Sequence, residues 1–518
     1  MAESRLDNAR RNMTSSVISR VINLIIPFVV RAIMLYTIGV EYLGLNGLFD
    51  SVFSFLCIAD LGINSAIVYM MYKPIAQGDT DSVCALLRVC RNFYRVTGVA
   101  VFVLGAALIP VLPKLIYGEV PEGIHLTTVY LILLANTSAG YFFFSYRETL
   151  FRASQRIDII TYVELVVRIL TNGAVIVVLL VTRNYYLRCV VILVMTVVRN
   201  LTVAYLSRIK YPQYVCRGSI TGEEKEQLRK QMSGLVVSSI SSRLSFDLDN
   251  IVISSLLGLT LLAKYQNYQL ISARMLEIVG LISASVLPGI GHSLVTESKE
   301  KNYNDMNRYQ LLYMWLNGWL AICMVCLFQP FMTFWLGRDM LLPDSLLPFF
   351  GLYYISLKMD DVCWQYRSAS GLFWEDRKRA LFAAVFNLTM DILLVRWLGV
   401  AGAMVTTILY QVFVDSIWGD RILFKYTFKE FNRWDYMKKR IYYMVVITFA
   451  GVLCWLAGRF IPVIDGRGIN AVLLLLARGL MCTLLSNAFM WLFFRRMPEY
   501  CGAVSLMSRL LHLNRTAE

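Results

Sequence analysis

Long runs of apolar residues follow one another along almost the whole chain, and short polar stretches separate them. A helix needs about 20 mostly apolar residues to cross the hydrocarbon core of a bilayer, and by this measure the runs predict about fourteen transmembrane helices. The predicted spans cover residues 13–38, 43–70, 93–116, 125–146, 157–181, 185–207, 234–258, 262–295, 309–336, 343–366, 378–398, 400–420, 441–463 and 470–494. The pattern therefore predicts an all-α, polytopic membrane protein.

The composition excludes an ordinary soluble protein. Of the 518 residues, 57% are hydrophobic and only 16% are charged, whereas soluble proteins carry about 25% charged residues. The net charge of +15 could indicate a nucleic-acid partner, but in a membrane protein Lys and Arg collect in cytoplasmic loops. We therefore expect no nucleic-acid partner.

The basic residues divide unevenly between alternate loops. Loops on the side of the N-terminal tail hold most of the Lys and Arg residues, and the richest are Ser207–Gly234 and Arg421–Arg440. The positive-inside rule then predicts that both termini are cytoplasmic. The first apolar run is predicted to be a retained span, because no small-residue cleavage site follows it.

Neither cysteine pattern nor sequence motif indicates catalysis. The 11 cysteines are odd in number and form no CxxC pair, so we expect small buried side chains rather than disulfides or a zinc site. The sequence contains no HExxH, GxSxG or Walker-type motif, and no loop is long enough for a catalytic domain. We therefore predict a protein that is not an enzyme and has no cofactor.

Two markers indicate an internal duplication. Tyr146-Arg147 and Tyr366-Arg367 are 220 residues apart, and Gly39 and Gly258 are 219 residues apart. Six spans per half give both halves the same orientation, with a symmetry axis along the membrane normal. The predicted domains are an N-lobe (1–210), a cytoplasmic linker (211–233), a C-lobe (234–425), two further spans (426–494) and a cytoplasmic tail (495–518).

Several charged side chains fall inside predicted spans. A basic residue at a helix centre costs about 2.5–3.5 kcal/mol on insertion scales, so these residues should face a protein interior or a wet cavity. The intramembrane basic residues are Arg20, Arg31, Arg95, Arg168, Arg199, Arg243, Arg274, Lys358 and Arg478.

Their spacing separates candidate ligands from ion pairs. Arg20 and Arg31 are about three helical turns apart on one face, which indicates an anionic ligand; the alternative is pairing with Asp50 and Asp60 on the next span. Other charges are spaced for mutual neutralisation along one helix. These pairs are Glu164 with Arg168, Arg243 with Asp247, and Arg274 with Glu277.

A second constellation is rich in oxygen atoms. Asn387 and Asp391 lie one turn apart on a predicted span, Thr407 lies on the next span, and Asp249 lies on the seventh. Carboxylate, amide and hydroxyl oxygens are the ligands that a hard cation prefers. The alternative is a hydrogen-bonded core network.

Parts of the chain resemble a known family. The segments Gly39–Phe49, Ala59–Ile63 and Tyr72–Ala76 resemble the opening of bacterial polysaccharide repeat-unit flippases, which share a superfamily with multidrug-and-toxin extruders and the lipid II flippase. Asp249–Ser255 and Asn387–Asp391 resemble stretches of the second half. In layout the resemblance covers residues 13–420.

The resemblance implies a V-shaped pair of six-helix lobes that moves an undecaprenyl-pyrophosphate-linked oligosaccharide by alternating access. It implies that Arg20 and Arg274 bind the pyrophosphate, although Arg274 stands about a turn beyond the expected position, which Gln269 occupies. Arg31 joins these candidates through its spacing from Arg20. It also implies a cation site made of Asp249, Asn387, Asp391 and Thr407, with Na⁺ or H⁺ as the coupling ion.

The resemblance further implies a monomer in the bacterial cytoplasmic membrane, surrounded by lipids and working with glycosyltransferases or a polymerase. Two alternatives stay open. A cation-coupled drug or metabolite antiporter of the same superfamily would favour an acidic cavity over arginines. A membrane polysaccharide polymerase or ligase would normally carry a large external loop, which this sequence lacks.

Overall fold

The computed structural model describes residues 22–57, 63–118, 120–121, 123–226, 228, 248–462 and 468–510. Every regular element in these ranges is helical, which confirms the predicted all-α class. The chain forms two compact units, Met1–Ala263 and Lys264–Glu518. The predicted domain boundaries remain a prediction.

Within the described ranges, seven helices are long and apolar enough to cross a membrane, or eight if a bent pair is counted as one span. The seven are α7 (Ile157–Thr182), α8 (Tyr185–Lys210), α10 (Leu259–Thr296), α11 (Lys299–Leu336), the continuous stretch Val400–Tyr426, α17 (Arg433–Gly458) and α18 (Ile469–Phe494). The bent pair joins α4 (Thr80–Ala107) to the 3-10 segment Ile109–Leu115 at 58°. A polytopic chain is thus confirmed, while the count of fourteen remains a prediction.

Breaks within apolar runs explain part of the difference in number. One predicted span corresponds to α5 (Leu126–Ala139), which ends before the short α6 (Glu148–Ala153). Another is divided into α12 (Leu347–Met359) and α13 (Asp361–Ala369). Apolar helices shorter than a full span also cover Ile22–Thr37 and Leu248–Leu257.

In the first unit, α8 packs between α5 and α7, and α4 packs against both α5 and α3 (Ile63–Gln77). The helix α2 (Val40–Leu56) contacts α4 and α5. Side chains define where these helices begin: Asp79 accepts a hydrogen bond from the Ser82 amide at the start of α4, and Asn184 accepts one from Leu187 at the start of α8. Such N-caps satisfy amide groups that have no partner within the helix.

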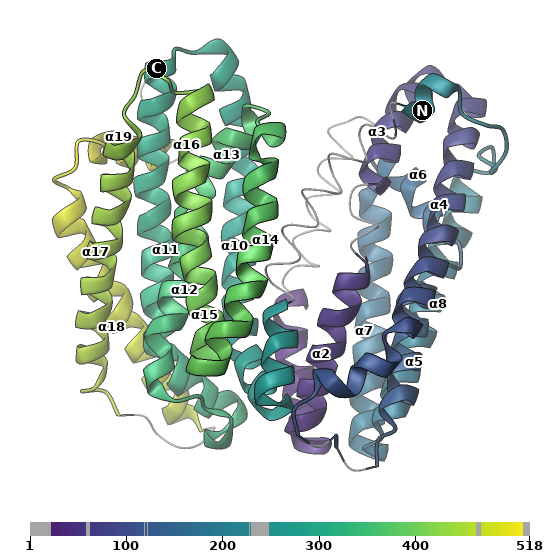
Figure 1. Ribbon diagram of the computed structural model, residues 1–518, viewed down its shortest axis with the longest axis horizontal. Coiled ribbons are helices and arrows are strands. Elements are labelled where there is room, and N and C mark those ends of the chain that lie inside the picture. Colours follow the sequence, from purple (N-terminus) through teal and green to yellow (C-terminus); the bar gives the residue numbers. More distant parts are fainter. Residues whose placement is uncertain are drawn as a thin grey trace. The chain divides into compact units, whose positions relative to one another are not determined.

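In the second unit, the long helix α11 contacts α17 and α18 and also α12 (Figure 1). Beyond α12 lie α15 (Val400–Leu409) and then α14 (Phe373–Leu398), which pack against each other. The stretch that begins with α15 continues through a π-helical turn, Tyr410–Ser416, into α16 (Ile417–Tyr426). The helix α19 (Tyr500–Leu510) packs on α11.

The markers of the repeat occupy matching places in the helix order. Gly39 precedes α2 and Gly258 precedes α10, and both have a positive φ, of 107° and 91°. Because side chains disfavour this conformation, glycine is the natural residue at both starts. The two Tyr-Arg pairs are buried in the short helical segments that follow α5 and α12.

Candidate functional site

A polar chain runs through the apolar helices of the first unit. Nη1 of Arg188 donates to Oδ1 of Asn46 at 2.9 Å, and Nδ2 of Asn46 donates to Oδ2 of Asp50 at 2.8 Å. Arg188 is only 7% exposed, and its guanidinium lies 5.3 Å from the centre of the Tyr185 ring. Asn46 thus connects a buried cation on α8 with a carboxylate on its own helix, α2.

Arg31 lies beside this chain on the helix Ile22–Thr37. Its Nη2 donates to the backbone oxygen of Ala263 at 3.3 Å, and the charge of Asp50 attracts it. The attraction to Asp50 agrees with the alternative in which Arg31 is neutralised by the next span. The other two residues of that prediction, Arg20 and Asp60, lie outside the described residues.

Sequence reasoning missed Arg188 because it counted this residue, although it lies near the start of the predicted span 185–207, with the preceding loop. The sequence does carry a signal. Asn184 is an N-cap, so α8 begins at Tyr185 and Arg188 already lies on the first turn of the helix. An N-cap followed by an apolar run therefore indicates that Arg188 belongs to the membrane-spanning helix and not to the loop.

The remaining predicted ion pairs have different outcomes. Arg274 does pair with Glu277, at 2.7 Å.

The prediction that Glu164 pairs with Arg168 is wrong, since Glu164 accepts from Arg199 of α8 at 2.5 Å. Arg199 also bonds Glu148, at 2.7 Å, so tertiary contact brings a better placed and less exposed cation to these carboxylates. Arg168 is exposed and makes no ion pair with any described residue. The pair Arg243 with Asp247 lies outside the described residues.

Three of the four predicted cation ligands belong to two packed helices of the second unit. Asn387 and Asp391 on α14 have no exposed surface, and Thr407 on α15 is 1% exposed. Among the described residues, neither the oxygen nor the nitrogen of the Asn387 amide has a hydrogen-bond partner. Buried polar groups are nearly always partnered, so this amide needs a partner such as a ligand. Asp249, in the first unit, is also buried.

The helices α14 and α15 approach closely because of one glycine. A Cβ on Gly402 would lie 2.3 Å from the backbone oxygen of Leu394. The Gly402 carbonyl also accepts a hydrogen bond from Thr406, at 3.0 Å. The backbones of α14 and α15 thus lie in direct contact at Gly402.

A buried ion network at the start of α17 was not predicted. Arg440, which has no exposed surface, pairs with Asp420 and lies 3.4 Å from Asp360. Asp360 also accepts from Arg367 at 2.7 Å. Sequence reasoning assigned Arg440 to a basic loop, because it lies at the edge of a run of Lys and Arg residues.

The same network contains a triad of potential metal ligands. The ligand atoms of Asp360, Cys363 and Asp420 lie within 4.8 Å of one another. Both carboxylates are, however, already paired with arginine, which supplies the positive charge that a metal would supply. All 11 cysteines are described and free.

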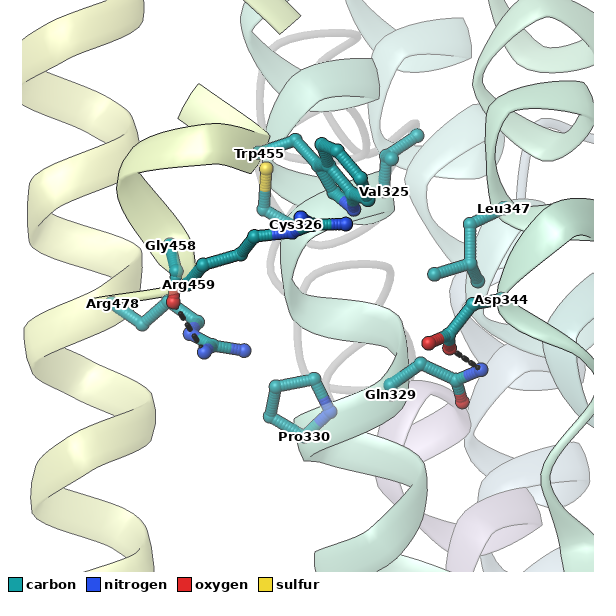
Figure 2. A pocket seen from close by; sticks show the side chains of 10 residues that line it. All are labelled: Val325, Cys326, Gln329, Pro330, Asp344, Leu347, Trp455, Gly458, Arg459 and Arg478. Atoms are coloured by element: carbon teal, nitrogen blue, oxygen red, sulfur yellow. Dashed lines mark hydrogen bonds between the residues drawn. The ribbon is translucent and has the colours of Figure 1, made fainter. Parts of the chain in front are cut away.

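A cavity of about 190 Å³ opens between α11, α17 and α18. Its two arginines make structural contacts. Arg478 donates to the backbone oxygen of Gly458 at 2.5 Å (Figure 2) and to that of Ile461, also at 2.5 Å. Cations stabilise a helix C-terminus in this way. The guanidinium of Arg459 lies 3.9 Å from the Trp455 ring. The arrangement explains the intramembrane Arg478 without a ligand.

The apolar helices, their helical breaks and the polar groups buried between them define a multi-pass membrane protein. The sequence matches the family model described as polysaccharide biosynthesis protein over residues 9–293, and the chain belongs to this family. No curated protein sequence matches the chain.

Solved structures of transporters share the fold. The lipid II flippase MurJ in an inward closed conformation is 15% identical, with a TM-score of 0.62, over 93% of this chain and 98% of that one. An inward-facing multidrug resistance MATE family transporter of the MOP superfamily is 16% identical, with a TM-score of 0.63, over 78% and 94%. An outward-facing MATE structure is 16% identical, with a TM-score of 0.50, over 80% and 93%.

Proposed function

We propose that the protein is a flippase that moves a polyprenyl-pyrophosphate-linked oligosaccharide across the bacterial cytoplasmic membrane by alternating access. Membership in the polysaccharide biosynthesis family supports this proposal. The observation that carries it is the group of Arg31, Asn46, Asp50 and Arg188 among apolar helices.

Guanidinium groups among apolar helices suit a pyrophosphate substrate. A pyrophosphate cannot cross hydrocarbon unaided, because an unpaired buried charge costs several kcal/mol. Guanidinium groups in a wet cavity replace its hydration with charge-assisted and often bidentate hydrogen bonds. Asp50 would hold the arginines in place while no substrate is bound. Moving a lipid-linked saccharide across a membrane needs no covalent step, so under this proposal the protein is not an enzyme.

The first test removes the two arginines of the first predicted span that are expected to bind the pyrophosphate. In proteoliposomes, the double variant Arg20→Ala/Arg31→Ala is expected to flip a polyprenyl-pyrophosphate saccharide at least about tenfold more slowly, because each charged hydrogen bond contributes about 1.5–3 kcal/mol. Flipping is measured by access of an external glycosidase to the saccharide.

The matched control is Arg168→Ala, since Arg168 is an exposed arginine on α7 without an ion pair among described residues. It should flip at the parent rate. A folded double variant that also flips at the parent rate would refute the cavity assignment.

We further propose that Asn387, Asp391 and Thr407, all in the second unit, hold a coupling cation, Na⁺ or H⁺. The buried amide of Asn387, with no hydrogen-bond partner among the described residues, supports this proposal. Oxygen ligands of this kind suit Na⁺.

For this site we expect flipping by the parent protein to slow when sodium is replaced by another monovalent cation at fixed membrane potential. The variant Asp391→Asn should be slow in both salts, because it lacks one ligand charge. The control Asp339→Asn changes an exposed carboxylate and should keep the sodium response. Equal flipping rates of the parent protein in both salts would exclude sodium as the coupling ion. A proton would then be the remaining candidate, and flipping rates measured over a pH series at constant sodium would test it.

The structural similarity to a MATE family transporter supports a second candidate function, that of a cation-coupled drug or metabolite antiporter. An organic-cation exporter would not need arginines in its cavity. Sodium- or proton-driven uptake of a fluorescent organic cation into proteoliposomes, with no flipping of the saccharide lipid, would favour the antiporter.

A further inference from the structure

A second pocket lies in the first unit, where the apolar run after α5 breaks. Its volume is about 250 Å³. The walls come from α4 and from the break that follows α5, and they combine guanidinium groups with aromatic rings. The residues that carry the argument are Arg91, Arg95, Tyr141, Phe142, Phe143 and Phe144. None of them belongs to the groups proposed above to bind the pyrophosphate or the cation.

The backbone of the break is strained. Phe143 and Phe144 have φ values of 48° and 66°, in the left-handed region that residues with a side chain disfavour, at about 1–3 kcal/mol each. Both rings are exposed, by 46% and 38%. A Cβ on Gly98 of α4 would lie 3.0 Å from the Phe142 ring, so glycine lets the break pack against α4. The surrounding structure holds this strained loop in place.

The pocket carries positive charge, and no described residue supplies a matching anion. Arg91 and Arg95 are one turn apart on α4, and neither forms an ion pair with a described residue. The Nε of Arg91 is buried and has no hydrogen-bond partner there. A third cation, Arg208, lies 5.2 Å from the Phe144 ring. The neighbouring carboxylate of Glu148 is engaged by Arg152 and Arg199.

The corresponding break in the second unit is different. There α12 passes through Asp360 directly into α13, and Arg367 is neutralised by Asp360. The buried Arg440 is paired as well. Arg367 therefore has a protein anion, whereas Arg91 and Arg95 have no acidic partner among the described residues. An anion from outside the chain would neutralise these two guanidinium groups.

We propose that this pocket binds the phosphate or diphosphate group of a membrane lipid in the cytoplasmic leaflet. Arg91 and Arg95 offer two planar forks to phosphate oxygens, and the exposed rings of Phe143 and Phe144 cover the apolar part of the lipid. Two sources share this chemistry, the saccharide carrier lipid and an anionic phospholipid. The placement in the cytoplasmic leaflet rests on the proposed function and on the predicted orientation with cytoplasmic termini. In that orientation the loop before the apolar run that begins at Val96 is cytoplasmic, and Arg95 directly precedes this run.

The experiment measures lipid binding to the full-length protein by native mass spectrometry. The probes are undecaprenyl diphosphate, phosphatidylglycerol and uncharged diacylglycerol. We expect Arg91→Gln/Arg95→Gln to bind at least one of the two phosphate lipids at least about tenfold more weakly, since two charge-assisted hydrogen bonds are lost. Binding of diacylglycerol should not change. Arg91→Lys/Arg95→Lys should keep most of the affinity because it keeps both charges.

The matched control is Lys73→Gln/Arg88→Gln, which removes the same charge from exposed positions of α3 and α4. It should bind all three lipids like the parent. If the Arg91→Gln/Arg95→Gln variant fails to fold, the single variant Arg95→Gln gives the same comparison, because Arg95 is exposed.

The two phosphate lipids distinguish the sources. A selective loss of undecaprenyl diphosphate identifies the carrier, and a selective loss of phosphatidylglycerol identifies a phospholipid site. In the second case the site stands even if the flipping assay refutes the proposed function. Unchanged binding of both phosphate lipids, or an equal loss of diacylglycerol binding, would overturn the proposal.

Discussion

Replacement of Arg440 by methionine is expected to lower the free energy of unfolding by about 3–5 kcal/mol, because removal of one partner leaves buried charges uncompensated. Arg440 has no exposed surface and pairs with Asp420. It also approaches Asp360 at 3.4 Å. Methionine has a similar length, so the loss should come from charge rather than from an empty space.

Thermal unfolding in detergent, followed by intrinsic fluorescence, measures this loss as a lower unfolding temperature. The matched control is Lys438→Met on the same helix. Lys438 is 78% exposed and lies 3.7 Å from Asp435, and exposed pairs of this kind contribute about 0–1 kcal/mol. Addition of Asp420→Asn to Arg440→Met should restore part of the stability, because it removes the buried carboxylate charge that loses its arginine partner in the single variant. An Arg440→Met variant as stable as the control would show that the network does not stabilise the unit.

Replacement of Gly402 by valine is expected to destabilise the protein by about 1–3 kcal/mol or more, because added atoms in a packed interface force the backbone to move. The added Cβ would lie 2.3 Å from the Leu394 carbonyl. Separation of α14 from α15 should also move Thr407 away from Asn387 and Asp391. We therefore expect flipping and its sodium response to be lost together.

The measurement compares unfolding temperatures with and without sodium, since a ligand of the native state raises the temperature of unfolding. Gly173→Val is the matched control, because a Cβ at Gly173 of α7 meets no atom within 4 Å. The control should keep the parent's sodium shift. A Gly402→Val variant with normal stability and an unchanged sodium shift would contradict both the tight contact and the link to the cation site.

The fold class was predictable because apolar runs of bilayer length depend only on composition and order. The positions of the breaks were less predictable. The run around Tyr141–Phe144 is as apolar as its neighbours, yet α5 ends at Ala139. The helix ends there because the following residues pack against Gly98 and because Phe143 and Phe144 have a left-handed backbone. Neither feature can be recognised from the local sequence pattern.

The candidate site was predictable where its residues share one helix. The spacing of Arg274 and Glu277 was enough to predict their ion pair. Spacing was misleading for Glu164 and Arg168, since Arg199 comes from a neighbouring helix. A residue on another helix can lie closer than one that is a single turn away, and sequence distance carries no information about it.

The sequence by itself determined that the chain is helical, that it has several apolar membrane-crossing segments and that Asn387 and Asp391 share a helix face. These properties follow from local composition and from the period of the helix. Only the tertiary structure decided which charges are paired: it assigned Arg199 to Glu164 and Glu148, buried Arg440 against Asp420, and left Arg91 and Arg95 without an acidic partner among the described residues. The physical reason is that the strength of a charge interaction depends on distance and burial in three dimensions.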